Sequence, residues 1–374
     1  MRGGGRLRVL VIAPLRFPIR RPHAGGLESA VWSEVTAMRA RGHEVAVIAA
    51  AGSDFVEAGG PFEIPAMRWA PTERPSDSTY PSSYEAVSVS ALDRALDHAA
   101  RARFDVVSNH CLHALPLLRA PELDAPMVTT LHTPVDAAFV EAHRRARGSG
   151  SVFLSVSAYT RAQWQRAGVP SDVLANGTDP ETWAFGPGGD GLVWFGRIVP
   201  EKGPHLAVRV ARALGLPLTI AGRIGDADYA RHAILPELSA DVRYVGELAP
   251  LDLADLVGRS AAAVLTPAWP EPFGLVAPEA LMCGTPVVSF AVGGVPEIAS
   301  GSPGMAPVPA GDVDAMARAA SALIERSRAE PDLRARIRAS AVRRFSLDAR
   351  MDRLEARLRL LASARASTRA ALSA

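Results

Sequence analysis

The sequence predicts an α/β protein with two domains, each built around a parallel β-sheet. The 374 residues are more than one core normally holds and suffice for two domains of about 150 to 200 residues each. Short apolar runs of strand length alternate with helical patterns along most of the chain, as in βαβ units. The stretch 183–191 contains four glycines, one proline and one acidic residue, which makes it the best domain boundary in the chain.

The first βαβ unit begins near the N-terminus. A buried strand is expected over residues 8–14, and a helix is expected from Leu27 to Gly42. The unit has no Gly-x-Gly-x-x-Gly motif, so dinucleotide binding through that motif is not predicted. The loop between strand and helix contains Gly25 and Gly26. These glycines are either a flexible turn or a place where backbone approaches an anion at the helix N-terminus.

Polar residues follow the next two predicted strands. A strand over 104–108 is followed by Asn109 and His110, and a strand over 127–131 is followed by His132. Each histidine is either a hydrogen-bonded residue at a strand end or part of a ligand site. No carboxylate or cysteine set accompanies them at the spacing of metal ligands, so no zinc site is predicted.

The first half also contains a segment that does not follow the βαβ pattern. Residues 51–90 are rich in Pro, Ser and Gly and are interpreted as an irregular excursion. Long loops in compact domains are often functional, and here an acceptor substrate is the candidate ligand. Strands over 152–155 and 172–175 are expected to complete the first sheet.

The second half opens with two basic residues in one loop. A strand ends near Gly196 and a helix starts about Gly203, which places Arg197 and Lys202 at a helix N-terminus. Lys202 is the only lysine among 41 basic residues. A compact ammonium and a guanidinium can together bind a nucleoside diphosphate, and a solvent-exposed basic pair is the alternative.

Two carboxylates lie between the predicted strands 261–265 and 286–290. Glu271 stands in an irregular Pro- and Gly-containing loop, and Glu279 stands in a segment that can form a helix. The loop after a strand in a βαβ unit lies on the ligand-binding edge of a parallel sheet. Either acid alone could instead serve only to offset the helix dipole.

The residues around these two acids favour a ligand-binding role over a purely structural one. Glu271-Pro-Phe-Gly-Leu, followed by Glu279 and by Gly284-Thr-Pro-Val-Val, resembles the signature of the retaining glycosyltransferases of family 4. The resemblance implies the GT-B fold, with two Rossmann-like, doubly wound domains that face a central cleft. It also implies an N-terminal acceptor domain, a C-terminal nucleotide-sugar domain and a terminal helix that crosses back to the first domain. We expect these parts at residues 1–185, 186–345 and 346–374.

The resemblance implies that the C-terminal domain binds the donor substrate. Glu271 would hold the donor sugar together with the backbone of Phe273, Gly274 and Leu275. Glu279 would accept hydrogen bonds from the ribose hydroxyls.

The diphosphate and the base have their own implied contacts. Arg197 and Lys202 match the family's phosphate motif, and the backbone at Gly25 and Gly26 would approach the same group. Leu248 is the best match for the backbone contact with the base. The base stays open, with UDP favoured over GDP.

His132, in Thr-Leu-His-Thr-Pro, resembles the family's active-site histidine, which hydrogen-bonds the donor sugar and diphosphate near the reacting carbon. His110 and Asn109 match positions that line the acceptor side. The residues implied to be catalytic are therefore His132, Glu271, Arg197 and Lys202.

The predicted function is transfer of a sugar, with retention, from a nucleoside diphosphate sugar to an unidentified small-molecule, lipid or glycan acceptor. We expect no cofactor and no metal, because Asp226 and Asp228 lie several residues beyond their strand, where the family has a variable turn. The alternatives are an epimerase or hydrolase of sugar nucleotides with the same fold and a non-catalytic GT-B-like partner protein. Acceptor identity and oligomeric state stay open.

The composition and charge of the chain bear on its possible partners and its location. The net charge of +2 gives no reason to expect a nucleic-acid partner, and no apolar run approaches the ~18 residues of a membrane span. We expect no signal peptide, buried thiols at Cys111 and Cys283, and a cytoplasmic protein. Thirteen arginines and five acids between residues 326 and 374 leave peripheral membrane contact open, with a solvated arginine face favoured. The last helix is expected to carry an apolar stripe that needs a partner surface, made of Leu347, Met351, Leu354, Leu358 and Leu361.

Overall fold

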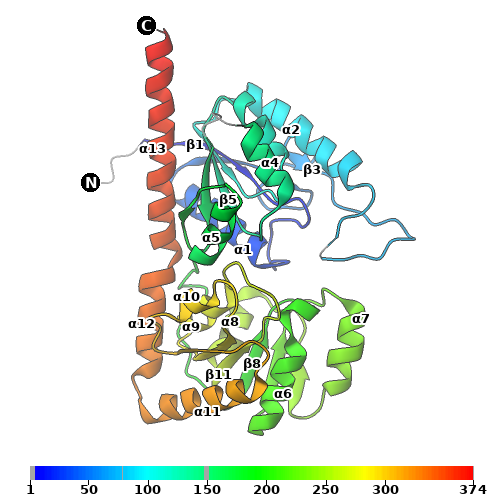
Figure 1. Ribbon diagram of the computed structural model, residues 1–374, viewed down its shortest axis with the longest axis vertical. Helices are drawn as coiled ribbons and strands as arrows, with labels where there is room; N and C mark the ends of the chain where they lie inside the picture. The colour runs from blue at the N-terminus through cyan, green and yellow to red at the C-terminus, as the bar shows by residue number, and fades with distance from the viewer. Residues whose placement is uncertain (1–4, 78, 147–150, 374) are drawn as a thin grey trace. The chain divides into compact units, whose positions relative to one another are not determined.

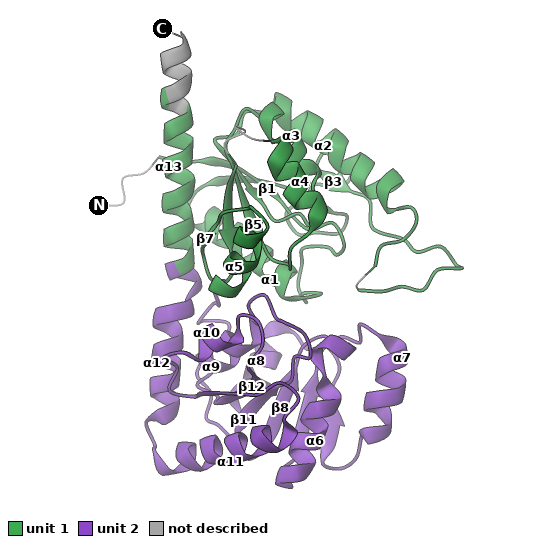
Figure 2. Cartoon of the chain, viewed as in Figure 1, with its two compact units in different colours: residues 1–175, 350–374 green, residues 176–349 purple. Residues whose placement is uncertain are grey.

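The computed structural model describes residues 5–77, 79–146 and 151–373, and the chain divides into two compact units (Figures 1 and 2). Unit 1 contains residues 1–175 and 350–374, and unit 2 contains residues 176–349. From the sequence, these boundaries were expected at 185/186 and 345/346. Residues 176–183 join unit 2 because the last helix of that unit holds them, through Arg338 to the carbonyls of Pro180 and Trp183.

Unit 1 is built on a parallel sheet with the strand order β3-β2-β1-β4-β5-β6-β7. The order reverses beside β1, so β1 and β4 flank a topological switch point, where open α/β sheets bind ligands. Edge strand β3 lies within the segment expected to be wholly irregular. It has only two residues, too few to give an alternating pattern. The strands are β1 (Arg8–Ile12), β2 (Glu44–Ala50), β3 (Glu63–Ile64), β4 (Val106–Asn109), β5 (Met127–Leu131), β6 (Val152–Ser155) and β7 (Asp172–Val173).

Helices pack on the sheet of unit 1 and close its core. Helix α1 turns Val31, Val35 and Met38 toward the core, and their spacing of four and three residues places them on one face of the helix. Helix α2 buries Leu92 and Leu96 against the same core. The helices are α1 (Gly26–Ala40), α2 (Ser90–Arg101), α3 (Leu115–Arg119), α4 (Ala137–Arg145), α5 (Ala158–Arg166) and α13 (Leu347–Ser373), with the short turns η1 (Glu85–Val89) and η2 (Ala120–Glu122).

Unit 2 repeats the arrangement with a six-stranded parallel sheet in the order β10-β9-β8-β11-β12-β13. Its switch point lies between β8 and β11. Trp194 and Phe290 are among its largest fully buried side chains. The strands are β8 (Leu192–Phe195), β9 (Leu218–Ala221), β10 (Val242–Tyr244), β11 (Ala262–Leu265), β12 (Val287–Phe290) and β13 (Met305–Val308).

The helices of unit 2 lie between these strands and after β13. Helix α12 ends at Phe345, and the carbonyl of Phe345 accepts a hydrogen bond from the Thr178 amide. The helices are α6 (Pro204–Leu214), α7 (Ala227–Tyr229), α8 (Pro250–Gly258), α9 (Val276–Met282), α10 (Val295–Ala299), α11 (Val313–Ala329) and α12 (Leu333–Phe345), with the turns η3 (Pro200–Lys202), η4 (Ala230–Ile234) and η5 (Leu235–Glu237).

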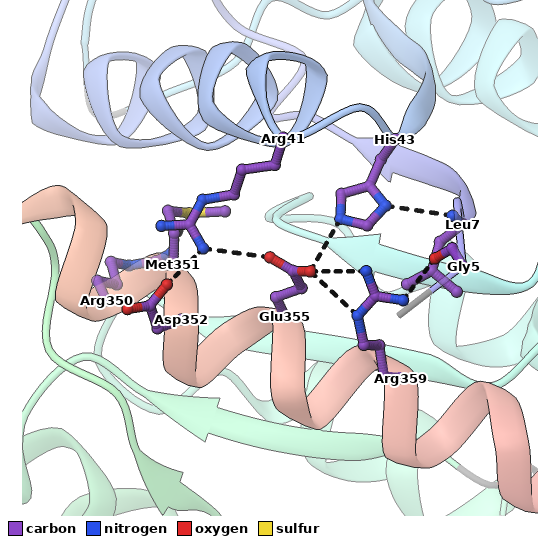
Figure 3. A network of polar contacts seen from close by, with 9 residues as sticks. All are labelled: Gly5, Leu7, Arg41, His43, Arg350, Met351, Asp352, Glu355 and Arg359. Carbon is purple, nitrogen blue, oxygen red and sulfur yellow. Dashed lines mark hydrogen bonds and ion pairs between the residues drawn. The ribbon is translucent and has the colours of Figure 1, made fainter. Parts of the chain in front are cut away.

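From residue 350 onward, helix α13 belongs to unit 1. Met351, Leu354 and Leu358 are fully buried, so the central part of the predicted stripe packs on this unit. Glu355, on the same helix, accepts hydrogen bonds from Arg41 at 3.1 Å and from Arg359 at 2.7 Å (Figure 3). Burial alone would raise the pKa of Glu355. The hydrogen bonds from Arg359 and Arg41 outweigh burial, so the pKa of Glu355 lies below its usual value.

The described residues contain neither a helix with the length and hydropathy of a membrane span nor a group of His, Cys, Asp and Glu that could hold a metal ion. Cys111 and Cys283 are free and buried, as predicted. Burial raises the pKa of each thiol to about 12.

Candidate functional site

Two loops of unit 2 meet at the β8/β11 switch point and carry Lys202 and Glu271. Thr266, just after β11, donates its hydroxyl to the carbonyl of Gly203 at 2.8 Å and receives the indole N–H of Trp194 at 3.1 Å. The amide of Ala268 donates to the carbonyl of Glu201 at 2.8 Å. These bonds hold the loop after β8 against the loop after β11.

Glycine is required where the two loops touch. Gly203 has φ +60°, and a Cβ atom there would lie 2.5 Å from the carbonyl oxygen of Thr266. A larger residue would push the loops apart. The glycine at position 203 is therefore needed to keep the neighbouring Lys202 in place.

Lys202 and Glu271 form an ion pair through Nζ and Oε1. Glu271 is only 7% exposed, and its Oε1 also accepts a hydrogen bond from the Trp269 indole at 3.1 Å. The Lys202 ammonium lies 5.8 Å from the centre of the Trp269 ring, within the range of a cation–π contact. An ammonium has three donors, so Lys202 can bind a further acceptor while it stays paired.

Arg197 stands half-buried in the same loop and pairs with Glu201 at 3.8 Å. From the sequence, Arg197 and Lys202 were expected to bind one nucleoside diphosphate together. In the structure each has an acidic neighbour, and the two cations share the loop between β8 and α6.

The backbone after Glu271 is shaped by glycine. Gly274 has φ +93°, a conformation that residues with a Cβ rarely adopt. Phe273 is buried against Phe345, and Leu275 precedes the first residue of α9. The carbonyl of Glu271 accepts the Gly294 amide at 2.8 Å, which fixes this loop from the other side.

Glu279 lies on α9, and its carboxylate has no hydrogen bond or ion pair among the residues that the structure describes. Burial raises the pKa of Glu279 to about 8. Its side chain is nevertheless partly exposed, so a ligand can reach it. A carboxyl group that lacks a protein partner keeps free lone pairs on its oxygens, which can accept hydrogen bonds from ligand hydroxyls.

Replacing Glu279 by Gln tests whether burial raises the pKa of this carboxyl group, because the raised pKa makes protein stability depend on pH. Because the folded-state pKa is raised, the folded protein binds the proton more tightly, and stability falls as pH rises from about 4.5 to about 8. We expect Glu279→Gln to become more stable than the wild type across this window, by up to about 4 kcal/mol at pH 8. Urea unfolding at several pH values measures the difference.

Glu330→Gln is the control, and we expect its effect on stability to be opposite to that of Glu279→Gln. Hydrogen bonds from Arg326 and Arg336 lower the pKa of Glu330. This carboxylate therefore stabilises the fold above its unfolded pKa, and the variant should lose stability at neutral pH and match the wild type in acid. A pH-independent difference for Glu279→Gln would show that its carboxyl is not held neutral.

Leu248 and the Asp226–Asp228 pair lie elsewhere in unit 2. Leu248 is half-buried in the loop before α8. Asp226 caps α7 by accepting the Tyr229 amide at 2.9 Å, and Asp228 pairs with Arg231 at 2.9 Å. Both acids therefore have structural partners within their own helical segment.

In unit 1, the predicted residues gather around the β1/β4 switch point. Gly25 precedes α1 and Gly26 is its first residue. Asn109 is the last residue of β4 and is completely buried, with its amide donating to Thr129 Oγ1 at 3.2 Å and its oxygen accepting the Cys111 amide at 3.1 Å. Through these two hydrogen bonds, the Asn109 side chain fixes the backbone at the end of β4.

His110 and His132 lie side by side. His110 Nδ1 is 2.9 Å from His132 Nε2, and the ring centroids are 5.2 Å apart. His110 is buried, whereas His132 is partly exposed and no hydrogen bond to its Nδ1 occurs among the described residues. Burial, helped by the charges of His110 and Arg350, lowers the pKa of His132 well below its usual value.

Three further residues of unit 1 belong to this group and were not singled out from the sequence: Glu34, Ser108 and Arg350. Glu34 Oε1 accepts from Ser108 Oγ at 2.7 Å and lies 3.0 Å from His110 Nε2, and its Oε2 accepts from Arg350 Nη1 at 3.0 Å. Burial raises the pKa of Glu34, but His110 and Arg350 lower it below its usual value, so the carboxyl is ionised. An acid between Val31 and Val35, on the buried face of α1, was the available signal.

Comparison with known proteins identifies the family. The model of the family described as Glycosyltransferase Family 4 matches residues 24–182, and the model described as Glycosyl transferases group 1 matches residues 182–344. The chain belongs to glycosyltransferase family 4. The resemblance inferred from the Glu271–Val288 string is confirmed.

Relatives in this family carry several different activities. The chain is 29% identical to the D-inositol 3-phosphate glycosyltransferase of Mycolicibacterium smegmatis over 91% of this chain and 88% of that protein. It is 36% identical to the glycogen synthase of Mycobacterium tuberculosis, but that match covers only 41% of this chain and 39% of the synthase. Family membership therefore does not by itself assign the acceptor.

Solved structures confirm the predicted fold. Anabaena HepE in complex with UDP and glucose has a TM-score of 0.71 at 18% identity, covering 94% of this chain and 99% of that one. Sucrose-phosphate synthase from Thermosynechococcus elongatus has a TM-score of 0.73 at 19% identity, covering 96% and 100%. At this identity the likeness concerns the fold, which is GT-B.

Proposed function

We propose that this family 4 glycosyltransferase moves a sugar from a UDP-sugar to an acceptor hydroxyl, with retention of anomeric configuration. The observation that carries the proposal is the Lys202–Glu271 ion pair at the β8/β11 switch point of unit 2. It brings one cation and one acid, which the sequence predicted for diphosphate and sugar, to the ligand-binding edge of the sheet.

Each member of the pair has a chemical role in the proposal. Lys202, with Arg197 nearby in the loop, balances the negative charge that grows on the departing diphosphate. Glu271 accepts hydrogen bonds from hydroxyls of the donor sugar and so orients it. Glu279, whose carboxyl group has no protein partner among the described residues, accepts hydrogen bonds from the ribose hydroxyls.

The proposed reaction requires no metal ion and no covalent nucleophile. The leaving-group charge that a divalent metal would balance is assigned to Lys202 and Arg197. Asp226 and Asp228, the acids with the Asp-x-Asp spacing, are engaged with Tyr229 and Arg231. We also propose that the transferred sugar is a hexose and that the protein acts in the cytoplasm, against an acceptor that is a small molecule, lipid or glycan.

A melting experiment with a panel of nucleotides tests the donor. We expect UDP and UDP-glucose, each at about 100 times its Kd, to stabilise the protein by about 2.7 kcal/mol, and GDP to do so less. Chelator should leave the effect of UDP-glucose unchanged. If GDP stabilises more than UDP, or if no UDP compound raises the melting temperature, the proposed donor is wrong.

The same samples separate the classes of reaction. A transferase consumes little UDP-glucose without an acceptor, whereas a hydrolase or epimerase converts the donor alone. The comparisons with known proteins give no support to those alternatives or to a non-catalytic partner.

A further inference from the structure

The two carboxylate oxygens of Glu271 have different neighbours. Oε1 accepts hydrogen bonds from Lys202 Nζ and from the Trp269 indole N–H. Oε2 has no hydrogen-bond donor among the described residues, yet it is not one of their buried unpartnered atoms, so solvent reaches it. Each oxygen of a carboxylate offers about two lone-pair sites. Protein donors therefore fill Oε1, and Oε2 is the oxygen that a ligand can use.

The sequence places the Trp269 indole beside Glu271. Each of these residues precedes a proline, Pro270 or Pro272, and a residue before proline avoids the helical backbone conformation in favour of an extended one. In an extended segment, side chains two residues apart project to the same side. The indole of Trp269 can therefore reach the carboxylate, and its N–H donates to Oε1 at 3.1 Å.

The two donors to Oε1 differ in how firmly they can hold it. Lys202 has a flexible four-carbon stem and an ammonium with three donors, of which one is directed at Oε1. In the proposed reaction its other donors bind the diphosphate, so the ammonium is attracted by two anions. The indole N–H is a single donor on a rigid ring, and Oε1 is its acceptor. Trp269 can therefore keep Oε1 in place when the ammonium of Lys202 moves.

We propose that Trp269 is a positioning residue whose indole N–H holds Oε1 of Glu271 and so presents Oε2 to the donor sugar. The inference rests on the proposed function, which assigns the sugar hydroxyls to Glu271, and it adds the group that orients this acid. Without the indole N–H, the carboxylate can rotate about its last side-chain bond, because such terminal torsions have broad energy wells. Oε2 then no longer has one fixed place in the site, and the donor sugar is held less well.

Trp269→Phe tests this role, because phenylalanine keeps an aromatic ring near the Lys202 ammonium but removes the N–H. We expect calorimetry to show UDP-glucose binding weakened by about 3- to 10-fold, the effect of one hydrogen bond, with UDP affinity changed by less than about twofold. A hydrogen bond with only a structural role would change the free energy of unfolding and affect both compounds alike. Equal losses for UDP and UDP-glucose, or no loss for either, therefore overturn the proposal.

Trp32→Phe is the matched control. Trp32 also lies between an acid and a cation, since its indole donates to Asp54 Oδ2 at 2.8 Å and the Arg21 guanidinium lies 4.0 Å from the centre of its ring. These three residues belong to unit 1. We expect Trp32→Phe to bind UDP and UDP-glucose as the wild type does. If it loses UDP-glucose affinity as selectively as Trp269→Phe, the loss does not come from the orientation of Glu271, and the proposal is wrong.

A double-mutant cycle shows whether Trp269 acts through Glu271. Glu271→Ala removes the carboxylate that the indole holds, so the further change Trp269→Phe should alter UDP-glucose affinity by less than about twofold. The effects of two independent residues would instead multiply. If the double variant shows the product of the two single losses, Trp269 does not act through Glu271.

The nuclear magnetic resonance signal of the Trp269 indole N–H gives a second measurement, which needs no variant of Glu271. The signal is assigned by its absence from Trp269→Phe. We expect the N–H to stay protected from exchange with solvent when UDP is added, although UDP attracts the ammonium of Lys202. An N–H that UDP exposes to solvent overturns the positioning role alone. If the wild type binds neither UDP nor UDP-glucose, the proposed function fails, and the positioning role, which needs a bound donor, fails with it.

Discussion

Replacing Lys202 by Ala is expected to lower the turnover number of sugar transfer by about 100-fold, on the scale of losing one charge contact in the transition state. The structure gives two reasons. The ammonium lies in the loop after β8, where it can reach a phosphate, and it pairs with the buried Glu271. Steady-state kinetics with varied donor separate the roles, since loss of leaving-group stabilisation lowers kcat, whereas loss of ground-state binding raises KM.

The variant should also be less stable, because among the described residues the Trp269 indole would then be the single side-chain donor left to the Glu271 carboxylate. Arg212→Ala is the matched control, since it removes an exposed cation of the same unit from its pairing with Glu237 on the surface. We expect its turnover to equal that of the wild type. If Lys202→Ala keeps full turnover, Lys202 does not bind the diphosphate.

The sheets were predictable because their strands are buried on both faces. Runs such as those around Leu10 and Val264 are apolar without interruption, which is the pattern of a parallel strand. Edge strand β3 was missed because two residues carry no periodicity. Helices α11 and α12 begin directly after Asp312 and Asp332, and an aspartate in that position is a helix-start signal that can be seen in the sequence.

The candidate site was only partly visible in the sequence. Glu271 and Lys202 were singled out as candidates by a local string and by the rarity of lysine, but nothing in the sequence indicated that they pair across 69 positions. Glu34 and Arg350 are separated by 316 positions, and no local pattern connects them. Long-range pairs of this kind depend on the topology of the sheet and on the return of the terminal helix, which single-sequence reasoning does not determine.

Gly293→Ala is expected to give the largest loss of stability among single-methyl additions near the site. Gly293 has φ +60°, and a Cβ atom there would lie 2.5 Å from the nitrogen and 2.7 Å from the carbonyl carbon of Glu271, and closer still to its carbonyl oxygen. The backbone of Glu271 must move to make room. We expect a loss of about 3 kcal/mol, combining the left-handed conformation with overpacking.

Gly301→Ala separates these two causes. Gly301 has φ +75°, but a Cβ atom there would have no heavy atom within 4 Å, so only the conformational cost of about 1 kcal/mol remains. Because a displacement of about 1 Å can cost about 100-fold in rate, Gly293→Ala should also lose most transfer activity, whereas Gly301→Ala keeps it. Urea unfolding and donor titration measure both effects. If Gly293→Ala and Gly301→Ala have equal stability and equal donor affinity, the packing of Gly293 against Glu271 does not hold this acid in place. The role proposed for the loop is then wrong.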